Sequence, residues 1–283
     1  MERLTQDEIR QITLQLLVKF DEFCREEGIR YSLGMGTLLG AVRHHGFIPW
    51  DDDADVVMVR PEYEKLLSAW RARPLLGCDL VSLELNSSFT APLAKLVDTG
   101  TALEQVDHMP GPQLGVYVDI FIYDAVPTDQ KAWSSHAMRG DRLQRLWTAA
   151  ELRVRPNEHN LVKVVGKRAL QAVGGARLLA LALRRYAKSI SYEKGDYVAN
   201  LQYSTTPRSA YRFPKGVVSN YQNLLFEGCE LSAFKDADAF LRGWYGDYMQ
   251  PPPEQERIGH HRYIAFRVAK CSDLENSNSQ ISN

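Results

Sequence analysis

The sequence predicts an α/β or α+β fold with a mixed sheet at its centre. Helical and strand-like segments alternate from residue 5 to residue 70, and several short strand-like segments follow between 79 and 122. A long helical stretch then occupies about 128–191. The chain has 283 residues, 45% of them hydrophobic and 24% charged, which suits one large globular domain or a core domain with an appendage.

The first helix has clear limits. Thr5 and Glu8 form a capping-box pattern, and Gly28 is placed to end the helix. Between these limits, the apolar residues that recur at helical spacing are Ile9, Ile12, Leu16, Phe20 and Phe23. We expect a short strand over 29–33, a glycine turn over 34–37 and a helix over 38–43 to follow.

The next elements follow an acidic segment. It runs into apolar residues up to Val59 that are typical of a buried strand, and Pro61 suits the first position of a helix over 61–70. Further strands are expected over 79–85, 93–97, 101–106 and 115–122. A mixed region over 192–270 closes the fold, and the polar tail after Cys271 is expected to be disordered.

Composition limits the class of protein. The formal net charge of −1 gives no global basic field, so nucleic acid is not an expected partner. No run approaches the ~18 apolar residues of a membrane span, and the N-terminus does not resemble a secretion signal. The cysteines stand far apart without a C-x-x-C pair, which favours reduced thiols in a cytoplasmic protein; they are Cys24, Cys78, Cys229 and Cys271.

The acidic segment is the most informative part of the chain. If it continues the strand, Asp51, Asp53 and Asp55 share one side while Asp52 points to the other. Carboxylates this close repel one another and are costly to bury unpaired, and a divalent cation removes both costs. Oxygen donors of this kind suit Mg²⁺ or Mn²⁺ together with substrate phosphates. The segment therefore indicates metal-assisted phosphate chemistry.

Two other interpretations of the acidic segment are less favoured. Acidic runs are more often solvated turns, but Trp50 and the apolar run after Asp55 indicate a buried edge here. A calcium loop of the EF-hand type fails, because the position that needs glycine for the sharp turn is Val56.

Asp119 and a glycine-rich turn supply two further parts. Asp119 lies within an apolar strand, where it either caps a turn, pairs with an arginine, or lies on a strand next to Asp53 and Asp55. In the last case the three carboxylates could hold one or two cations and orient or deprotonate an attacking hydroxyl. The glycines in Gly34-Met-Gly-Thr form either a plain tight turn or a backbone site for phosphate oxygens.

These residues carry a resemblance to a known family. The segment from Tyr31 to Val59, with Gly34-Met-Gly-Thr and Phe47-Ile-Pro-Trp-Asp-Asp-Asp-Ala-Asp, resembles the signature of the LicD family. These are phosphotransferases of the nucleotidyltransferase superfamily, related to fukutin-type enzymes. Segments 94–98, 118–121 and 244–261 resemble family segments in the same order. The likeness spans about 5–270 and is weakest over 128–192.

The resemblance implies a fold and an organisation. It implies a nucleotidyltransferase-like catalytic core with a mixed sheet over 1–127 and a helical insertion over 128–192. C-terminal additions over 193–271 would complete the same catalytic unit, and 272–283 would be a disordered tail.

The resemblance also implies an activity. Asp53, Asp55 and Asp119 would bind Mg²⁺ or Mn²⁺, with Asp119 as base or base-positioning group, and Gly36 and Thr37 would contact substrate. The donor would be a CDP-linked alcohol such as CDP-choline. The enzyme would transfer phosphocholine or a related phospho-alcohol to a glycan hydroxyl and release CMP. The glycan would be a cell-surface polysaccharide, teichoic acid or lipopolysaccharide. Two alternatives stay open: a nucleotidyltransferase that releases pyrophosphate from an NTP, and an inactive glycan- or nucleotide-binding scaffold.

Other residues are candidates for substrate contact. Arg43 and Lys95 lie beside the motif segments and could bind phosphate oxygens, although each could also be a surface cation. His261 resembles a family position and could contact a phosphate or the acceptor, or it could be an ordinary surface or core histidine. Asp51 could orient the metal ligands, and Asp52 more simply caps or pairs locally.

A basic stretch lies between 160 and 192. It has no acidic residue and seven basic ones: Lys163, Lys167, Arg168, Arg177, Arg184, Arg185 and Lys188. With its interleaved Leu, Val and Ala it could rest on anionic lipid at the inner face of a membrane, where a lipid-linked glycan acceptor would lie. The slightly favoured alternative is a helix packed on the core with a solvated basic face.

Overall fold

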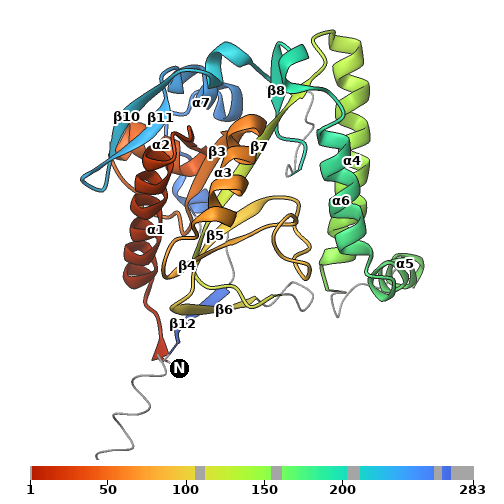
Figure 1. Cartoon of the computed structure of the whole chain (residues 1–283), viewed down its shortest axis with the longest axis horizontal. Coiled ribbons are helices and arrows are strands. Elements are labelled where there is room, and N and C mark those ends of the chain that lie inside the picture. The colour runs from red at the N-terminus through yellow and green to blue at the C-terminus, as the bar shows by residue number, and fades with distance from the viewer. Residues whose placement is uncertain (1, 106–111, 154–160, 203–210, 258–262, 269–283) are drawn as a thin grey trace, which may run out of the picture.

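The protein is built on a mixed central sheet. The computed structural model describes residues 2–105, 112–153, 161–202, 211–257 and 263–268. The seven strands of the sheet are, along its main path, β2 (Ser32–Leu33), β3 (Asp55–Val59), β7 (Tyr117–Val126), β5 (Ala94–Asp98) and β4 (Cys78–Val81), with β8 (Tyr197–Ala199) on β7 and β9 (Phe213–Pro214) on β8. Figure 1 shows helices on both sides of this sheet, which confirms the predicted fold class.

The centre of the sheet is the parallel pair of β3 and β7. β7 has β-branched and aromatic residues along ten buried positions, and the five residues of β3 are also buried. Both strands are therefore enclosed on their two faces, as parallel pairs usually are. β3 and β7 are the central strands of the path, whereas β2, β5, β4 and β8 join antiparallel to their neighbours.

Three helices accompany the first strands: α1 (Gln6–Glu26), α2 (Met35–His44) and α3 (Arg60–Ala72). The predicted capping box begins α1, because the Thr5 hydroxyl accepts the Glu8 N–H while the Glu8 carboxylate accepts the Thr5 N–H. The predicted glycine turn over 34–37 is wrong, because α2 already begins at Met35 with Gly34 as its N-cap. The extended Gly34 backbone donates its N–H to the Asp55 carbonyl. Gly34 is thereby bound to β3, and the helix begins at the next residue.

The expected strand through the acidic segment is also shorter than predicted. β3 begins at Asp55, and 51–54 have no regular structure, so the argument that alternate aspartates share one face of a strand does not hold. Asp51 instead donates its N–H to the Ile48 carbonyl in a local turn. The remaining predicted strands are found with shifted ends, and β6 spans Thr101–Gln105.

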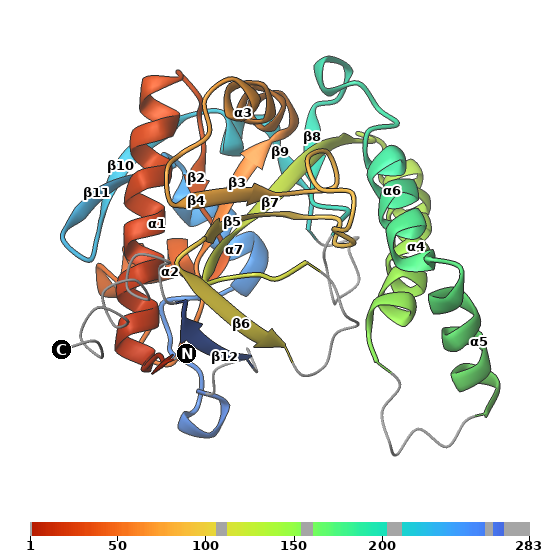
Figure 2. The same cartoon turned by 60° about the horizontal axis from the view of Figure 1, so that its bottom comes forward.

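The chain after β7 forms a helical unit at one side of the molecule, and we call α4 (Gln130–Glu151), α5 (Leu161–Ala172) and α6 (Gly175–Ala187) the helical unit. In Figures 1 and 2 it stands beside the sheet, with α5 reaching outward from α4 and α6. Small clusters attach it to the core: Trp133 packs with Val126 and Leu201, and Trp147 packs with Leu83. The helices predicted over 128–191 are thus present.

The C-terminal part returns to the sheet and its surroundings. It adds the hairpin β10 (Tyr221–Phe226) and β11 (Cys229–Phe234), the helix α7 (Ala237–Tyr245), the strand β12 (Tyr263–Arg267), and 3-10 helices at Tyr192–Lys194, Lys215–Val218 and Glu254–Glu256. β12 lies between β6 and the short N-terminal strand β1 (Glu2–Arg3). The chain after 192 therefore pairs with strands from the first half. The tail predicted to be disordered lies outside the described residues.

One large apolar core joins the sheet to α1, α2, α3, α7 and the β10–β11 hairpin. A buried ion pair crosses it: the Arg60 guanidinium donates to both carboxylate oxygens of Asp124, at 2.7 and 2.8 Å. Cys24, Cys78 and Cys229 are free thiols, and Cys271 lies outside the described residues. Among the helices that the structure describes, none is both long and apolar enough to cross a membrane.

Candidate active site

The parallel pair brings two buried aspartates together. Asp55 is the first residue of β3, and it lies directly opposite Asp119 of β7 in the strand register. Their side chains are 7% and 6% exposed. Asp53, two residues before the strand, completes a group whose carboxylate oxygens all lie within 4.8 Å of one another. The predicted proximity of Asp119 to Asp53 and Asp55 is confirmed.

The loop that carries Asp51 and Asp53 is fixed from α1. The Arg10 guanidinium donates to the Pro49 carbonyl at 2.7 Å and to the Asp51 carbonyl at 3.0 Å. The Asp51 carboxylate lies against Gly36, where a Cβ would come within 2.4 Å of its Oδ2. Gly36 therefore makes room for a carboxylate at the start of α2, and any larger residue would push Asp51 away.

Thr37 holds the first residue of β3. Its buried hydroxyl oxygen accepts the Asp55 N–H at 2.8 Å, and the Gly34 N–H donates to the Asp55 carbonyl at the same distance. Both contacts bind the start of α2 to the strand. This geometry gives Thr37 a contact with protein backbone, and the predicted contact with substrate stays a prediction.

The clustered carboxylates change one another's pKa values. Burial raises the pKa of Asp55 well above its usual range, and the charges of Asp53, Asp119 and Asp51 raise it further. Burial and the neighbouring Asp53 also raise the pKa of Asp51 to about 7. Lys95 supplies one opposing charge, since its ammonium group bonds Asp119 from the adjacent strand β5. One lysine among these carboxylates leaves a surplus of negative charge.

This donor set fits a divalent cation. Three convergent carboxylates, two of them buried, offer the hard oxygen ligands that Mg²⁺ and Mn²⁺ prefer. A bound cation would offset the repulsion that raises the pKa of Asp55. These carboxylates are therefore better suited to a site with a bound metal ion than to one without it.

A cavity of about 420 Å³ opens in front of the carboxylates. Asp51, Asp53 and Asp55 lie in its wall, and Arg43 lies on the same wall at the end of α2. Aromatic rings form much of the rest: Trp50, Tyr245 and Tyr248. The cavity wall thus combines carboxylates, the guanidinium group of Arg43 and aromatic side chains.

Arg43 lines this cavity, and Arg257 lies over the ring of Trp50, another residue of its wall. Burial and the charge of Arg257 both lower the pKa of the Arg43 guanidinium. The Arg43 Nη1 donates to the Tyr248 carbonyl at 2.6 Å. Arg257 lies over the ring of Trp50, with its Cζ 5.0 Å from the ring centre. Two adjacent guanidinium groups beside a carboxylate cluster give the cavity one acidic and one basic side.

The candidate residues named from the sequence divide into three groups. Asp53, Asp55 and Asp119 come together, and Asp51, Gly36 and Arg43 line the cavity beside them. Lys95 is buried against Asp119 and over the Tyr117 ring, so it is not a surface cation, and its contact with phosphate oxygens stays a prediction. His261 lies outside the described residues.

Sequence reasoning missed several residues of this region: Arg10, Trp50 as part of the cavity wall, Tyr245, Tyr248 and Arg257. Tyr245 and Tyr248 stand in the segment from Trp244 that resembles the family, so that segment was a usable signal. Arg10 had no such signal, because its contact with the loop joins residues about forty positions apart.

Comparison with known proteins places this site in a class. Residues 28–137, which include α2, β3 and β7 with all three clustered aspartates, match the family model described as "LicD/FKTN/FKRP, nucleotidyltransferase domain". The chain therefore contains a nucleotidyltransferase-type domain. Over these residues the chain is similar to proteins of the LicD family, as the sequence motifs indicated.

Relatives extend the match beyond this domain. The lipopolysaccharide cholinephosphotransferase LicD of Haemophilus influenzae is 29% identical over 268 residues, which cover 94% of this chain and 99% of the relative. Two uncharacterized proteins, from Rickettsia prowazekii and Rickettsia typhi, are each 50% identical over 42 residues, 15% of this chain.

Proposed function

We propose that this protein is a metal-dependent phosphotransferase that moves phosphocholine, or a related phospho-alcohol, from a CDP-linked donor to a glycan hydroxyl and releases CMP. The observation that carries the proposal is the cluster of Asp53, Asp55 and Asp119, of which Asp53 and Asp55 line an open cavity. The similarity to a lipopolysaccharide cholinephosphotransferase over nearly the whole of both chains supports the donor and the class of acceptor.

The reaction is a displacement at phosphorus. The acceptor oxygen attacks the phosphorus that carries the alcohol, the bond from that phosphorus to the bridging oxygen breaks, and CMP leaves with the electron pair. A divalent cation on Asp53, Asp55 and Asp119 would neutralise charge on the donor phosphates. Asp119 is our choice for orienting the acceptor hydroxyl or accepting its proton, and its contact with Lys95 fixes the position of its carboxylate.

The basic side of the cavity suits the donor phosphates. Arg43 and Arg257 lie close enough to lower the pKa of Arg43, and an anion between them would relieve that repulsion. Thr37 and Gly36 would act on the donor only through the position of α2, because Thr37 bonds Asp55 and Gly36 accommodates Asp51. In this proposal Arg43 and Arg257 bind the donor phosphates, whereas Gly36 and Thr37 position the aspartates.

The aromatic wall favours a cationic alcohol. Trp50, Tyr245 and Tyr248 line the cavity, aromatic rings attract quaternary ammonium groups, and Arg257 already lies over the ring of Trp50. Among CDP-linked donors this chemistry favours CDP-choline over a CDP-alditol. The reduced cysteines and the cytidine donor lead us to place the reaction in the cytoplasm.

The test is a donor screen followed by product analysis. We expect CDP-choline to raise the melting temperature only when Mg²⁺ is present, and more than CDP-ribitol, CDP-glycerol, CTP or ATP do. With lipopolysaccharide as acceptor, choline should appear on the glycan and CMP in solution, and Asp53→Ala should abolish both while the protein remains folded. Stabilisation by NTPs with pyrophosphate release would instead identify a nucleotidyltransferase, and no metal-dependent shift would leave the inactive scaffold.

A further inference from the structure

Charge is distributed very unevenly along this chain. Residues 130–188, which span the helical unit, contain thirteen Lys and Arg but only three Asp and Glu. Because the whole chain has a formal net charge of −1, residues 130–188 carry +10 and the rest of the protein carries −11. A near-neutral protein thus has one strongly basic side.

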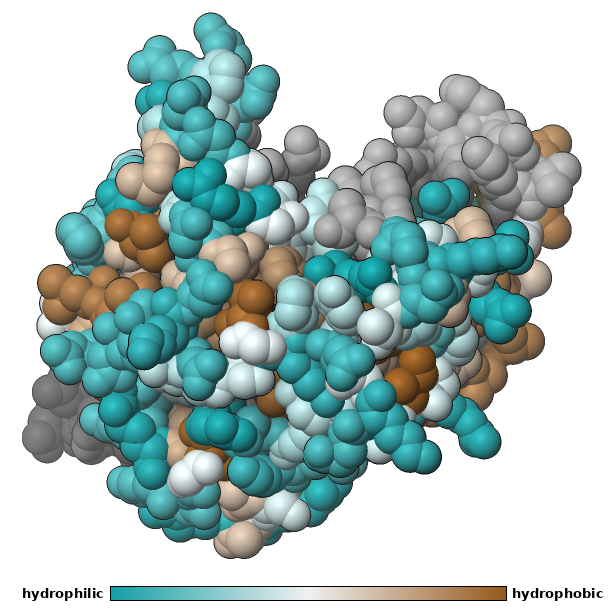
Figure 3. All heavy atoms as spheres, turned by 90° about the horizontal axis from the view of Figure 1, so that it is seen from above, coloured by the Kyte–Doolittle hydropathy of each residue, from teal (hydrophilic) through white to brown (hydrophobic). Residues whose placement is uncertain are grey.

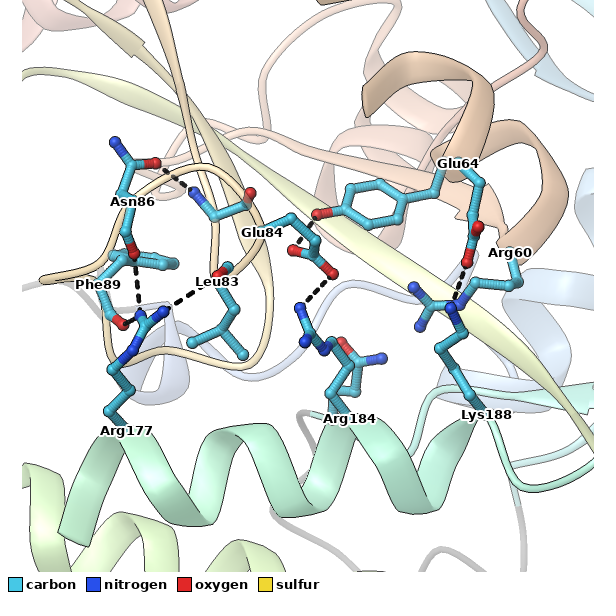
Figure 4. Close-up of polar contacts among 12 residues, drawn as sticks. Arg60, Glu64, Leu83, Glu84, Asn86, Phe89, Arg177, Arg184 and Lys188 are labelled. Carbon is cyan, nitrogen blue, oxygen red and sulfur yellow. Dashed lines mark hydrogen bonds and ion pairs between the residues drawn. The ribbon is translucent and has the colours of Figure 1, made fainter. Parts of the chain in front are cut away.

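Part of this basic charge faces the core. Figure 4 shows Arg177, Arg184 and Lys188 of α6 pointing toward α3 and the loop that follows β4. Arg177 donates to the Asn86 and Phe89 carbonyls, Arg184 pairs with Glu84, and Lys188 pairs with Glu64. Three of the seven residues in the predicted basic stretch therefore fasten the helical unit to the core. The outer surface of the helical unit is formed by other residues.

The outer face of the helical unit is partly apolar. Of the eleven large apolar side chains that are exposed within the described parts of the chain, Met138, Leu146, Leu161, Val165 and Leu178 belong to this unit, and Val173 lies between α5 and α6. Leu161, Val165 and Val173 are 77%, 64% and 68% exposed. Figure 3 shows brown side chains along this edge of the molecule, next to teal ones.

α5 presents this pattern most clearly. The positions Leu161, Val165, Ala169 and Ala172 lie on one side of the helix, and all four are exposed. An amphipathic helix normally turns such a face toward the core, so the arrangement here is reversed. Exposed arginines accompany this surface: Arg139, Arg142 and Arg145 on α4 and Arg168 on α5.

We propose that this outer face of the helical unit docks on an anionic lipid bilayer. The exposed aliphatic side chains of α4 and α5 enter the headgroup region, and the surrounding arginines bind the lipid phosphates. A second copy of the chain is a poor occupant, because two such basic faces repel each other. Nucleic acid would satisfy the arginines but would leave the aliphatic side chains without apolar partners.

The test is binding of the full chain to vesicles. The protein should sediment with vesicles that contain about 30% phosphatidylglycerol in phosphatidylcholine, and much less with pure phosphatidylcholine. Raising the NaCl concentration from about 0.05 M to about 0.5 M should weaken binding at least about tenfold. The variant Leu161→Ser/Val165→Ser should lose the salt-resistant part of binding, and Arg142→Glu/Arg145→Glu should lose at least about tenfold in partition coefficient.

Matched controls separate this surface from general effects. Leu76→Ser/Leu225→Ser removes two exposed apolar side chains elsewhere, and Lys194→Glu/Lys235→Glu makes the same charge change outside the helical unit. Both controls should bind vesicles like the unmodified protein, and so should Asp53→Ala, whose defect lies in the active site. Equal losses in test and control variants would overturn the proposal. Binding to RNA or DNA with no binding to anionic vesicles would overturn it as well.

Discussion

Asp55 illustrates how a single residue is placed for function at a cost to stability. Its carboxylate is buried among other carboxylates, and its backbone is held on both sides by Thr37 and Gly34. The fold thus keeps the residue in a position where burial and neighbouring charge raise its pKa. Shifted pKa values of this kind, in the absence of a bound cation, are common at functional sites such as those that bind a cation.

The charge repulsion leads to a prediction for Asp53. In the absence of metal, Asp53→Asn should raise the free energy of unfolding by about 1 kcal/mol, because it removes one of the charges that disturb Asp55. The same variant should lose the rise in melting temperature that Mg²⁺ gives the unmodified protein. Thermal unfolding with EDTA and with Mg²⁺ measures both effects.

Asp79→Asn is the matched control, since Asp79 is exposed on β4 away from the cluster. It should change neither the stability without metal nor the response to Mg²⁺. If Asp53→Asn keeps the full Mg²⁺ response, the cation does not bind at Asp53.

At the scale of elements, Glu62 connects α3 to the segment before β2. Its carboxylate, almost fully buried, accepts the Arg30 N–H at 3.0 Å and the Arg30 guanidinium at 2.8 Å, and it pairs with Lys65 at 3.0 Å. Burial alone would raise the pKa of Glu62, but these contacts outweigh it and lower the pKa. The acidic side chain in the first turn of α3 is also favoured by the helix dipole.

A pH-dependent contribution to stability follows from this contact. Because the pKa of Glu62 is lower in the folded than in the unfolded protein, its contribution is complete above the unfolded pKa of about 4.3 and is lost as the pH falls through the folded pKa. Glu62→Gln should therefore cost about 1–3 kcal/mol at neutral pH and progressively less in acid. Urea unfolding across this pH range measures the difference.

Glu22→Gln, on the exposed side of α1, serves as the comparison and should cost little at any pH. A difference between Glu62→Gln and the unmodified protein that stays constant from neutral to acidic pH would mean that packing, and not charge, explains the loss.

At the scale of the whole molecule, the apolar core and the carboxylate cluster occupy different parts of the fold. The large apolar core includes residues from Leu4 to Ala265 and joins the sheet to four helices and a hairpin, while the carboxylates lie at one end of β3 and β7. Burial of this core is the main source of stability. Metal should thus be needed for the reaction and not for folding.

Chelation tests this separation. EDTA should abolish phosphotransfer, Mg²⁺ or Mn²⁺ should restore it, and the far-UV circular dichroism spectrum should stay the same throughout. Collapse of the spectrum after chelation would contradict the prediction, because it would show that the cation holds the fold together.

The sequence by itself determined the local features of this protein. The capping box of α1, the buried strand after the aspartates and the apolar strand around Asp119 follow from patterns that act over a few residues, and these were predicted correctly. The family signature lies in the same continuous block, so the nucleotidyltransferase domain could be recognised from it.

Tertiary structure alone decided what lies beside these features. The start of α2 at Met35 depends on the bond from Gly34 to Asp55, and the aspartate loop depends on Arg10 of α1. Arg257 reaches Trp50 from the other end of the chain. Similarly, only packing could decide which basic residues of α6 face the core and which face outward. Periodicity reports the environment along one element, whereas these contacts depend on how distant elements are placed against each other.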